Sequence, residues 1–289
     1  MATAPSEFAL GAGGAAPGRV GLRLGRFLRW TATAVTGIAV AVLLTFIGLP
    51  LLAIFQHVPL SALLVQLHSP VALQALFISL KTSLTALLFI VLIGTPVAHL
   101  LGTKRFVGRS LLVTLFELPL VLPPVVAGIG LFVAFGRFGL LGSHLQRFGI
   151  SLPFTWVAVV MAQAFVAMPF YVRQAVAAFA SIDSQLLGAS RSLGAGPSKT
   201  FLRVAVPLAR QSLLAGAALA WARALGEFGA TALFAGNLQG VTQTLPLAIY
   251  DQFNSADLTA CLAMSALLIA VSFAVLITVK LILRSRSWV

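Results

Sequence analysis

Residues 72–101 read ALQALFISLKTSLTALLFIVLIGTPVAHLL and contain one charged side chain, Lys81. A membrane-spanning helix needs about 20 apolar residues to cross about 30 Å of hydrocarbon, so this stretch is long enough to span a bilayer. The whole chain shares its character, because 60% of the 289 residues are hydrophobic and only 9% are charged. Soluble domains carry roughly 25% charged residues, which makes a soluble protein with a very large core a poor alternative. The sequence therefore predicts an all-α membrane protein.

Six stretches have this length and composition, so we predict a polytopic bundle of six transmembrane helices: 31–55, 72–101, 110–135, 155–178, 210–235 and 258–283. The first stretch follows a basic segment but is longer than the apolar region of a signal peptide, so we expect it to be retained as a membrane helix. Residues 1–30 form a Gly/Ala-rich and then basic tail, which we expect to be partly disordered, and residues 284–289 form a short C-terminal tail.

The 19 Lys and Arg residues outnumber the 6 Asp and Glu residues and give a net charge of +13. In a soluble protein this excess would indicate nucleic-acid binding. With six alternating helices, however, only Arg137 and Arg147 lie on one side, and Lys81 and Arg223 lie inside helices. The other basic residues all fall on the opposite side: Arg19, Arg23, Arg26, Arg29, Lys104, Arg105, Arg109, Arg173, Arg191, Lys199, Arg203, Arg210, Lys280, Arg284 and Arg286. The positive-inside rule then places both termini in the cytoplasm, without any need for nucleic acid.

The longest cytoplasmic connection, residues 179–209, has the pattern of two short helices. Asp183 or Ser184 can cap the first helix, and Gly194 is placed to end it. Pro197 can start a second helical turn, and Pro207 marks a further break. The first helix has an apolar side, which suits a groove in a partner protein, formed by Leu186, Leu187 and Leu193.

This connection resembles the EAA loop of ABC importer permeases. The family pattern is Glu-Ala-Ala, three residues, Gly, nine residues, an aliphatic residue, one residue, an aliphatic residue and Pro. The present sequence matches it in register at Gly188, Ala189, Ser190, Gly194, Val204, Val206 and Pro207, with Arg191 in the same short helix. The resemblance implies that residues 179–209 are the coupling loop that docks onto a cytoplasmic ATPase subunit. The sequence departs from the pattern at Gly188, which replaces the acidic residue and loosens the helix by about 1 kcal/mol relative to Ala. An ordinary basic loop is the alternative.

Four other stretches are similar to the molybdate branch of the same family: LPLVLPPVV (118–126), AFGRFGLLG (134–142), RALGEFGATALFAGN (223–237) and TQTLPLAIY (242–250). Sulfate permeases are also similar, particularly around GEFG. The resemblance covers about residues 72–283 and implies a type I, binding-protein-dependent permease core.

For the assembly, the resemblance implies a homodimer in the bacterial inner membrane, two ATPase subunits and a periplasmic or surface oxyanion-binding protein. It implies no catalytic residue, metal or cofactor in this chain, because the partner subunit uses the ATP. The only phosphate-loop candidate, Lys199-Thr200, fails because Ser198 and Leu193 occupy the positions where that loop needs glycine.

Several polar groups within the predicted helices are candidates for the translocation pathway or its gate. Arg223 and Glu227 are four residues apart, so on a helix spanning 210–235 they would share one face and pair. Together with Thr231 they line an anion route, or they form a structural ion pair; intramembrane charges are consistent with either role. In the third helix Glu117 precedes three prolines, which predict a kink facing the bundle interior at Pro119, Pro123 and Pro124. Glu117 itself lies on the pathway or near the cytoplasmic interface.

Three rival functions remain at the sequence level. A secondary anion transporter would use the same buried charges, but it gives no reason for the spacing between Gly188 and Pro207. An intramembrane enzyme would need clustered catalytic groups or metal ligands, whereas the four histidines are far apart in sequence: His57, His68, His99 and His144. A sulfate or tungstate ABC permease differs only in its ligand.

Overall fold

The computed structural model describes residues 19–284, with side chains described from residue 33 to residue 278 and at Leu281. It divides the chain into two compact units between Gln56 and His57. The first unit consists, in its described part, of nearly all of helix α1 (Arg19–His57). Its segment 33–57 is strongly apolar, and large side chains such as Phe46 and Leu44 are exposed around it. A helix that is apolar all round is suited to lipid.

The second unit is entirely helical within the described residues. Its elements are α2 (Leu60–His68), α3 (Pro70–Thr103), α4 (Arg109–Val121), α5 (Pro124–Phe135), α6 (Gly142–Arg147), α7 (Trp156–Ala180), α8 (Ser184–Ser192), α9 (Pro197–Thr200), the π-helical turn η1 (Phe201–Ala205), α10 (Val206–Leu225), α11 (Gly229–Phe234), α12 (Leu245–Asn254) and α13 (Leu258–Arg284).

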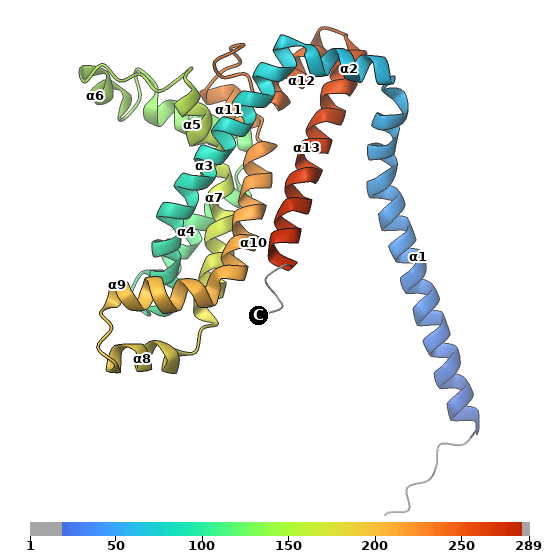
Figure 1. Ribbon diagram of the computed structural model, residues 1–289, viewed down its shortest axis with the longest axis vertical. Coiled ribbons are helices and arrows are strands. Elements are labelled where there is room, and N and C mark those ends of the chain that lie inside the picture. The colour runs from blue at the N-terminus through green and yellow to red at the C-terminus, as the bar shows by residue number, and fades with distance from the viewer. Residues whose placement is uncertain (1–18, 285–289) are drawn as a thin grey trace, which may run out of the picture. The chain divides into compact units, whose positions relative to one another are not determined.

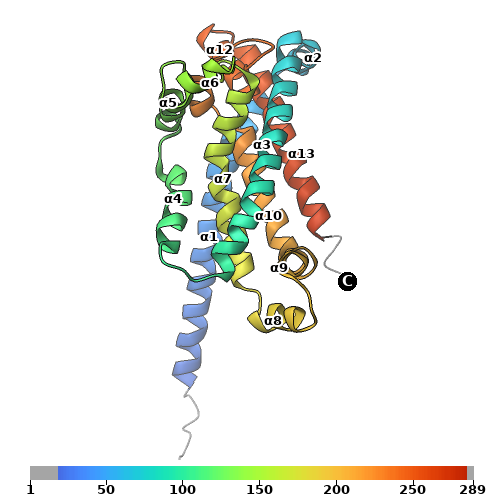
Figure 2. The same ribbon diagram turned by 90° about the vertical axis from the view of Figure 1, so that its left-hand side faces the viewer.

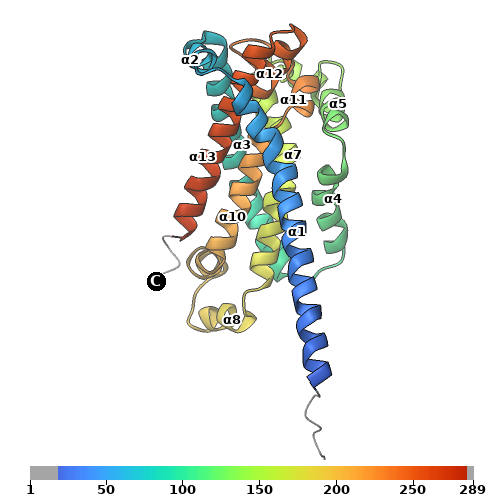
Figure 3. The same cartoon turned by 90° about the vertical axis from the view of Figure 1, so that its right-hand side faces the viewer.

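Long helices form the upright part of the second unit, and short helices gather at its two ends. Helices α3, α7, α10 and α13 run along the unit (Figure 1). Helices α2, α6, α11 and α12 lie at one end, called here the α12 end, and α8 and α9 lie at the other, called the α8 end (Figures 2 and 3). The helices α2, α6 and α12 lie in the connections between the six predicted spans, where hydropathy did not reveal them.

Small residues hold α3, α7 and α10 close together. A Cβ atom at Gly94 of α3 would lie 3.0 Å from the ring of Tyr171 on α7, and one at Gly102 would lie 2.8 Å from the Cβ of Phe179. On α10, Gly216 approaches Gln174 of α7 in the same way. Apolar helices in a bilayer gain little from burying apolar area against each other, so close backbone packing is what stabilises their contact. Buried alanines fill the rest of this core: Ala86, Ala98, Ala164, Ala167, Ala175, Ala220 and Ala224.

Hydrogen bonds between side chains tie the same helices together. The hydroxyls of Thr95 on α3 and Tyr171 on α7 are 2.6 Å apart. The indole N–H of Trp221 on α10 donates to the hydroxyl of Ser83 on α3 at 3.1 Å. Each of these polar groups would be costly to bury without a partner, so the pairs fix the rotation of the helices about their axes.

The third predicted span is broken rather than kinked. Helices α4 and α5 meet at a bend of 115° between Val121 and Pro124. The prolines at 123 and 124 cannot donate the helical hydrogen bonds, and Pro124 starts the new helix. The described part of the chain thus has five helices long and apolar enough to cross a membrane, or six if the bent pair counts as one span.

The fifth predicted span, 210–235, was wrong as a single helix. Helix α10 ends at Leu225, and a separate helix α11 begins at Gly229. Gly226 occupies the C-cap position of α10, and glycine in a helix interior costs about 1 kcal/mol relative to alanine. The carboxylate of Glu227 also accepts a hydrogen bond from the backbone of Ala230, which offers that N–H a partner outside a continuous helix.

Three smaller expectations also need correction. Arg173, counted among the basic residues on the cytoplasmic side, lies inside α7 and within the predicted span 155–178. Residues 19–30, expected in the N-terminal tail, belong to α1, while residues 1–18 lie outside the described part of the chain. At the other end, Arg284 belongs to α13, and the remaining tail residues 285–289 are not described.

Candidate functional site

A helical hairpin at the α8 end, residues 183–200, forms the first candidate site. The carboxylate of Asp183 accepts a hydrogen bond from the backbone N–H of Gln185 at 2.8 Å and so caps α8. At the other end of α8, Gly194 has a φ of +82°, a left-handed conformation that glycine adopts without strain. The N–H groups of Gly194 and Ala195 donate to the carbonyls of Arg191 and Ser190, which together make a Schellman motif.

The second limb of the hairpin leads directly into a long helix. Pro197 starts α9, and the helical chain then continues through the π-helical turn η1 and α10 to Leu225. The limbs are joined by the hydroxyls of Ser190 and Thr200, which are 3.2 Å apart. In Figure 1, α9 lies across the unit and α10 runs along it. The break expected at Pro207 was wrong, because the helical chain is continuous from Pro197 to Leu225 and Pro207 lies in the first turn of α10.

The hairpin exposes apolar and basic side chains. Leu187 is buried, but Leu186 is 50% exposed and Leu193 is 88% exposed, and Arg191 is also exposed. A groove of about 540 Å³ runs beside them between α8 and α10, lined by Leu186, Arg203, Val204, Pro207, Leu208, Arg210 and Gln211. Gly188 and Ala189 are exposed, and a Cβ at Gly188 would meet nothing within 4 Å. The structure therefore brings most of the sequence-predicted coupling residues onto one accessible hairpin.

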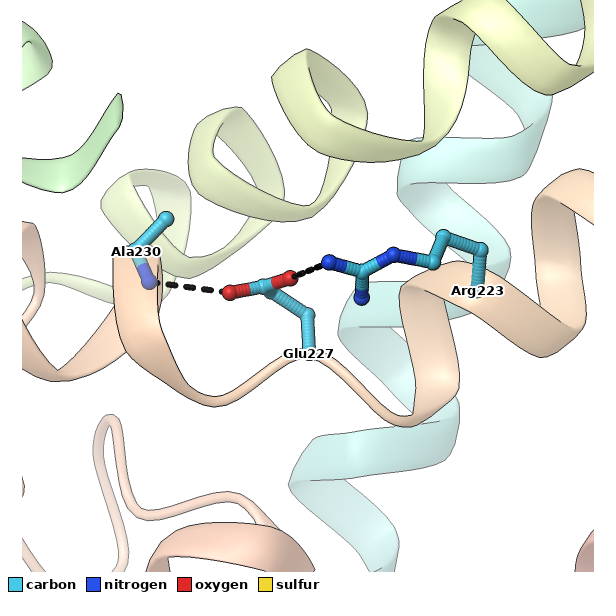
Figure 4. A network of polar contacts seen from close by, with 3 residues as sticks. All are labelled: Arg223, Glu227 and Ala230. Atoms are coloured by element: carbon cyan, nitrogen blue, oxygen red, sulfur yellow. Dashed lines mark hydrogen bonds and ion pairs between the residues drawn. The ribbon is translucent and has the colours of Figure 1, made fainter. Parts of the chain in front are cut away.

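A buried ion pair between α10 and α11 forms the second candidate site (Figure 4). The guanidinium Nη2 of Arg223 lies 2.7 Å from Oε2 of Glu227, and the other carboxylate oxygen, Oε1, accepts from the N–H of Ala230 at 2.8 Å. The side chain of Glu227 is 1% exposed, whereas that of Arg223 is 27% exposed. A buried carboxylate is tolerated only when its charge is compensated, and here Arg223 forms the ion pair with Oε2 while the Ala230 N–H donates to Oε1. The arginine is the member of the pair that remains open.

Helix α5 packs against this region. A Cβ at Gly229 would lie 3.0 Å from Pro124, and one at Gly128 would lie 2.8 Å from the backbone carbonyl oxygen of Ala230. Thr231, also on α11, is completely buried. The sequence-predicted residues Arg223, Glu227, Thr231 and Pro124 are thus brought together where the α4–α5 bend meets the α10–α11 break.

Glu117 does not belong to this cluster. Its Oε1 lies 3.7 Å from Nε of Arg173 on α7, and the pair is exposed, with 41% of the Glu117 side chain and 72% of the Arg173 side chain accessible. Sequence analysis singled out Glu117 but missed its partner, because Arg173 was counted only as one of the basic residues on the cytoplasmic side.

A hydrogen-bond clamp at the α12 end was also missed. The Asp251 carboxylate accepts from the side-chain amides of Asn237 and Gln243, both at 2.7 Å, and so fastens the loop between α11 and α12. The sequence offered one signal. Asp251 ends the largely uncharged stretch TQTLPLAIYD (242–251), and no basic residue lies three or four positions away to pair with it.

Comparison with known proteins identifies the family. Residues 90–287 match the family described as "Binding-protein-dependent transport system inner membrane component". The chain is 43% identical over 240 residues to the "Molybdenum transport system permease protein ModB" of Mycobacterium tuberculosis, covering 82% of this chain and 89% of that protein. It is 36% identical over 196 residues to the "Sulfate transport system permease protein CysW" of Synechococcus elongatus, covering 68% of each chain.

Solved structures agree on the fold. A chain from the "Crystal structure of a bacterial ABC transporter involved in the import of the acidic polysaccharide alginate" superposes with a TM-score of 0.71 and 15% identity, over 92% of this chain and 99% of that one. The predicted all-α, type I ABC permease fold is therefore confirmed. Because the family match spans more than half of the chain and the ModB relative is similar over most of it, this protein belongs to the binding-protein-dependent transport system inner membrane components and is the permease subunit of an ABC importer.

Proposed function

We propose that the chain is the permease subunit of an ATP-driven molybdate importer and that two identical copies enclose the pathway. The observation that carries the substrate assignment is the 43% identity, over four fifths of this chain, to permeases named for molybdenum transport. A sulfate permease is the second candidate, favoured by the 36% identity to CysW, but that similarity covers a smaller share of the chain.

In this proposal the α8 end faces the cytoplasm, together with both termini. Support comes from the basic residues of the second unit: Lys104, Arg105, Arg191, Lys199 and Arg203 lie in or beside the segments at the α8 end. Only Arg137 and Arg147 lie in the connection between α5 and α7, at the α12 end. Removing Arg173 from the count leaves this asymmetry in place, and cytoplasmic segments of membrane proteins are enriched in Lys and Arg.

The ATPase subunit docks on the hairpin. Leu186 and Leu193 supply exposed apolar contacts, and the adjoining groove accepts side chains of the partner. The caps at Asp183 and Gly194 hold α8 as a rigid body, so a displacement of the ATPase moves the hairpin instead of unwinding it. The continuous helical chain from Pro197 to Leu225 then carries this displacement to the α10–α11 break.

The pathway passes the buried ion pair. The charge of Glu227 is compensated by the ion pair with Arg223, and its other oxygen accepts from the N–H of Ala230, so the carboxylate does not repel an anion strongly. The guanidinium of Arg223 has further N–H donors and is partly exposed. It can therefore donate a pair of hydrogen bonds to two oxygens of one oxyanion. Thr231, Pro123 and Pro124 lie on the elements that would move with it, because α5 packs on α11.

The transport cycle follows from these parts. A periplasmic binding protein delivers the oxyanion at the α12 end, ATP closes the two ATPase subunits, and the hairpins are drawn together. The permeases switch from inward-facing to outward-facing, take up the anion, and reset after hydrolysis. ATP is used by the partner subunit, and this chain performs no covalent chemistry and needs no cofactor of its own.

The test of the substrate is reconstitution of the chain with its ATPase and binding protein in proteoliposomes. We expect ATP-driven uptake of molybdate that excess tungstate inhibits and excess sulfate does not. Stronger competition by sulfate than by tungstate would make the chain a sulfate permease. Uptake that follows an ion gradient and ignores ATP would instead identify a secondary transporter.

A further inference from the structure

The ion pair between Arg173 and Glu117 lies in an unusual place. Arg173 is on α7, seven residues before the helix ends at Ala180, and Glu117 is on α4, eight residues after the helix begins at Arg109. At a rise of about 1.5 Å per residue, these positions are about 10 and 12 Å from the helix ends at the α8 end. Both side chains are nevertheless exposed in the single chain, Arg173 by 72%. Inside the hydrocarbon layer an exposed charge is costly, so an ion pair on these spans calls for surroundings other than lipid.

The surroundings of Arg173 differ from a lipid-facing surface. In the last two turns of α7 the exposed residues are Arg173, Ala177 and Ala180, which are spaced i, i+4, i+7 and form one narrow stripe between the half-buried Phe170 and Val176. The outward face of α3 instead carries large apolar side chains at Phe77, Leu84, Leu88, Phe89 and Leu92, all exposed. Lipid is expected against the α3 surface, and something other than lipid against the α7 stripe.

Helix α4 continues the same polar surface. Ser110, Thr114 and Glu117 are spaced i, i+4, i+7 and therefore lie on one face, while Leu111, Leu115 and Leu118 lie on another. Ser110 and Thr114 are exposed. Because Glu117 contacts Arg173, the polar face of α4 adjoins the small-residue stripe of α7. This surface carries the Arg173–Glu117 ion pair, two hydroxyls and two alanines, which suit the wall of an aqueous passage, while Leu111 and Leu115 are exposed on the adjacent face of α4.

We propose that Arg173 is an anion-binding station inside the membrane, which takes a tetrahedral oxyanion in transit, and that Glu117 is its resident counter-charge. The inference rests on the proposed transport function and names a second site on the same route, on a different pair of helices from Arg223. Exposed ion pairs with a separation near 4 Å are weak, so an arriving oxyanion can replace the Glu117 carboxylate at the guanidinium without a large barrier. When the anion leaves, Glu117 neutralises Arg173 again, so the anion is not trapped.

The pairing of Arg173 with Glu117 also has an advantage over an arginine without a counter-charge. An unneutralised guanidinium in a narrow passage would hold a dianion tightly and slow its release, whereas conduction requires binding that is weak enough to reverse.

Water access and charge at this position can be measured with thiol reagents. The chain has a single cysteine, Cys261, which is buried, so Cys261→Ala gives a background free of thiols. In this background Glu117→Cys places a thiol beside Arg173. The complex of permease, ATPase and binding protein is then treated with an anionic and a cationic thiosulfonate of similar size, and each rate is divided by the rate for a free thiol in solution.

We expect both reagents to modify the Glu117→Cys variant, with the anionic reagent favoured by about tenfold, the lower limit of electrostatic focusing in a charged cleft. Adding Arg173→Gln should reduce this preference to about one, and Arg173→Lys should keep it. Molybdate added from the side of the coupling hairpin should slow the modification when Arg173 is present and have no effect with Arg173→Gln.

The matched control is Phe89→Cys on the outward face of α3, which we expect to stay unmodified by either charged reagent. The proposal is overturned if the thiol at position 117 is as unreactive as the thiol at position 89, since the pair then faces lipid or a protein contact. It is equally overturned if the thiol at position 117 reacts without charge preference or without protection by the oxyanion. None of these outcomes affects ATP-driven uptake by the unaltered chain, which tests the proposed function separately.

Discussion

At the residue scale, the Glu227 carboxylate and the Arg223 guanidinium compensate each other's charge. Glu227 has one oxygen on Arg223 and the other on the N–H of Ala230, and it is almost completely buried. Removing one partner of a buried ion pair leaves an uncompensated charge and typically costs about 3–5 kcal/mol, whereas replacing both partners by apolar groups can be nearly neutral. The pair therefore fixes the geometry of the α10–α11 break, whatever it contributes to net stability.

Glu227→Ala should destabilise the purified permease more than Glu227→Gln does. The alanine variant leaves both the guanidinium and the Ala230 N–H without an acceptor, while glutamine keeps an acceptor oxygen in place. We expect a loss of roughly 3 kcal/mol for alanine and a smaller loss for glutamine, measured as thermal unfolding in detergent. Equal unfolding temperatures for the two variants would contradict the assigned contacts.

At the scale of elements, the conformation of Gly194 terminates the coupling helix. Gly194→Ala and Gly188→Ala are a matched pair, because a Cβ at either position meets nothing within 4 Å and only Gly194 has a positive φ. We expect Gly194→Ala to cost about 1 kcal/mol locally and to lower ATP-driven uptake. Gly188→Ala should favour α8 by up to about 1 kcal/mol and leave uptake intact. Uptake that is the same in both variants would mean that the shape of the hairpin does not matter.

The contact between α3 and α7 offers a second matched pair. A Cβ at Gly102 would lie 2.8 Å from the Cβ of Phe179 and 2.9 Å from the carbonyl oxygen of Val176, so Gly102→Ala must push the helices apart. Overpacking of this kind typically costs about 1–3 kcal/mol. Gly130→Ala on α5 meets nothing within 4 Å and should be neutral or stabilising. The measurement is the thermal unfolding temperature of each variant. A Gly102→Ala protein that unfolds at the same temperature as the unaltered chain would contradict the close approach of α3 and α7.

The elements also show which features a single sequence can predict. The caps at Asp183 and Gly194, the start at Pro197 and the bend at Pro123 and Pro124 depend on local backbone chemistry, and the sequence predicted each of them. The break after Leu225 was not predicted, because the local hydrogen bond from the Ala230 N–H to the Glu227 carboxylate competes with a helix that the apolar spacing favours. The pairing of Arg173 with Glu117 was not predicted, because the two residues lie on different helices and far apart in sequence.

For the whole molecule, the distribution of Lys and Arg predicts that the α8 end is cytoplasmic. Ala189 is exposed on α8, so Ala189→Cys in the Cys261→Ala background reports which side of the membrane the hairpin occupies. We expect a membrane-impermeant maleimide to label this variant in inverted vesicles and not in intact, right-side-out vesicles. Labelling from outside would reverse the topology and remove the hairpin from reach of any cytoplasmic ATPase.

The family and the fold make the chain a permease subunit, and the central claim is that a separate ATPase drives it through the α8–α9 hairpin. The most direct test is molybdate uptake into proteoliposomes that contain the permease and its binding protein, with and without the ATPase subunit. The account predicts uptake only when both the ATPase and ATP are present. Uptake of the same rate by the permease without an ATPase would contradict it.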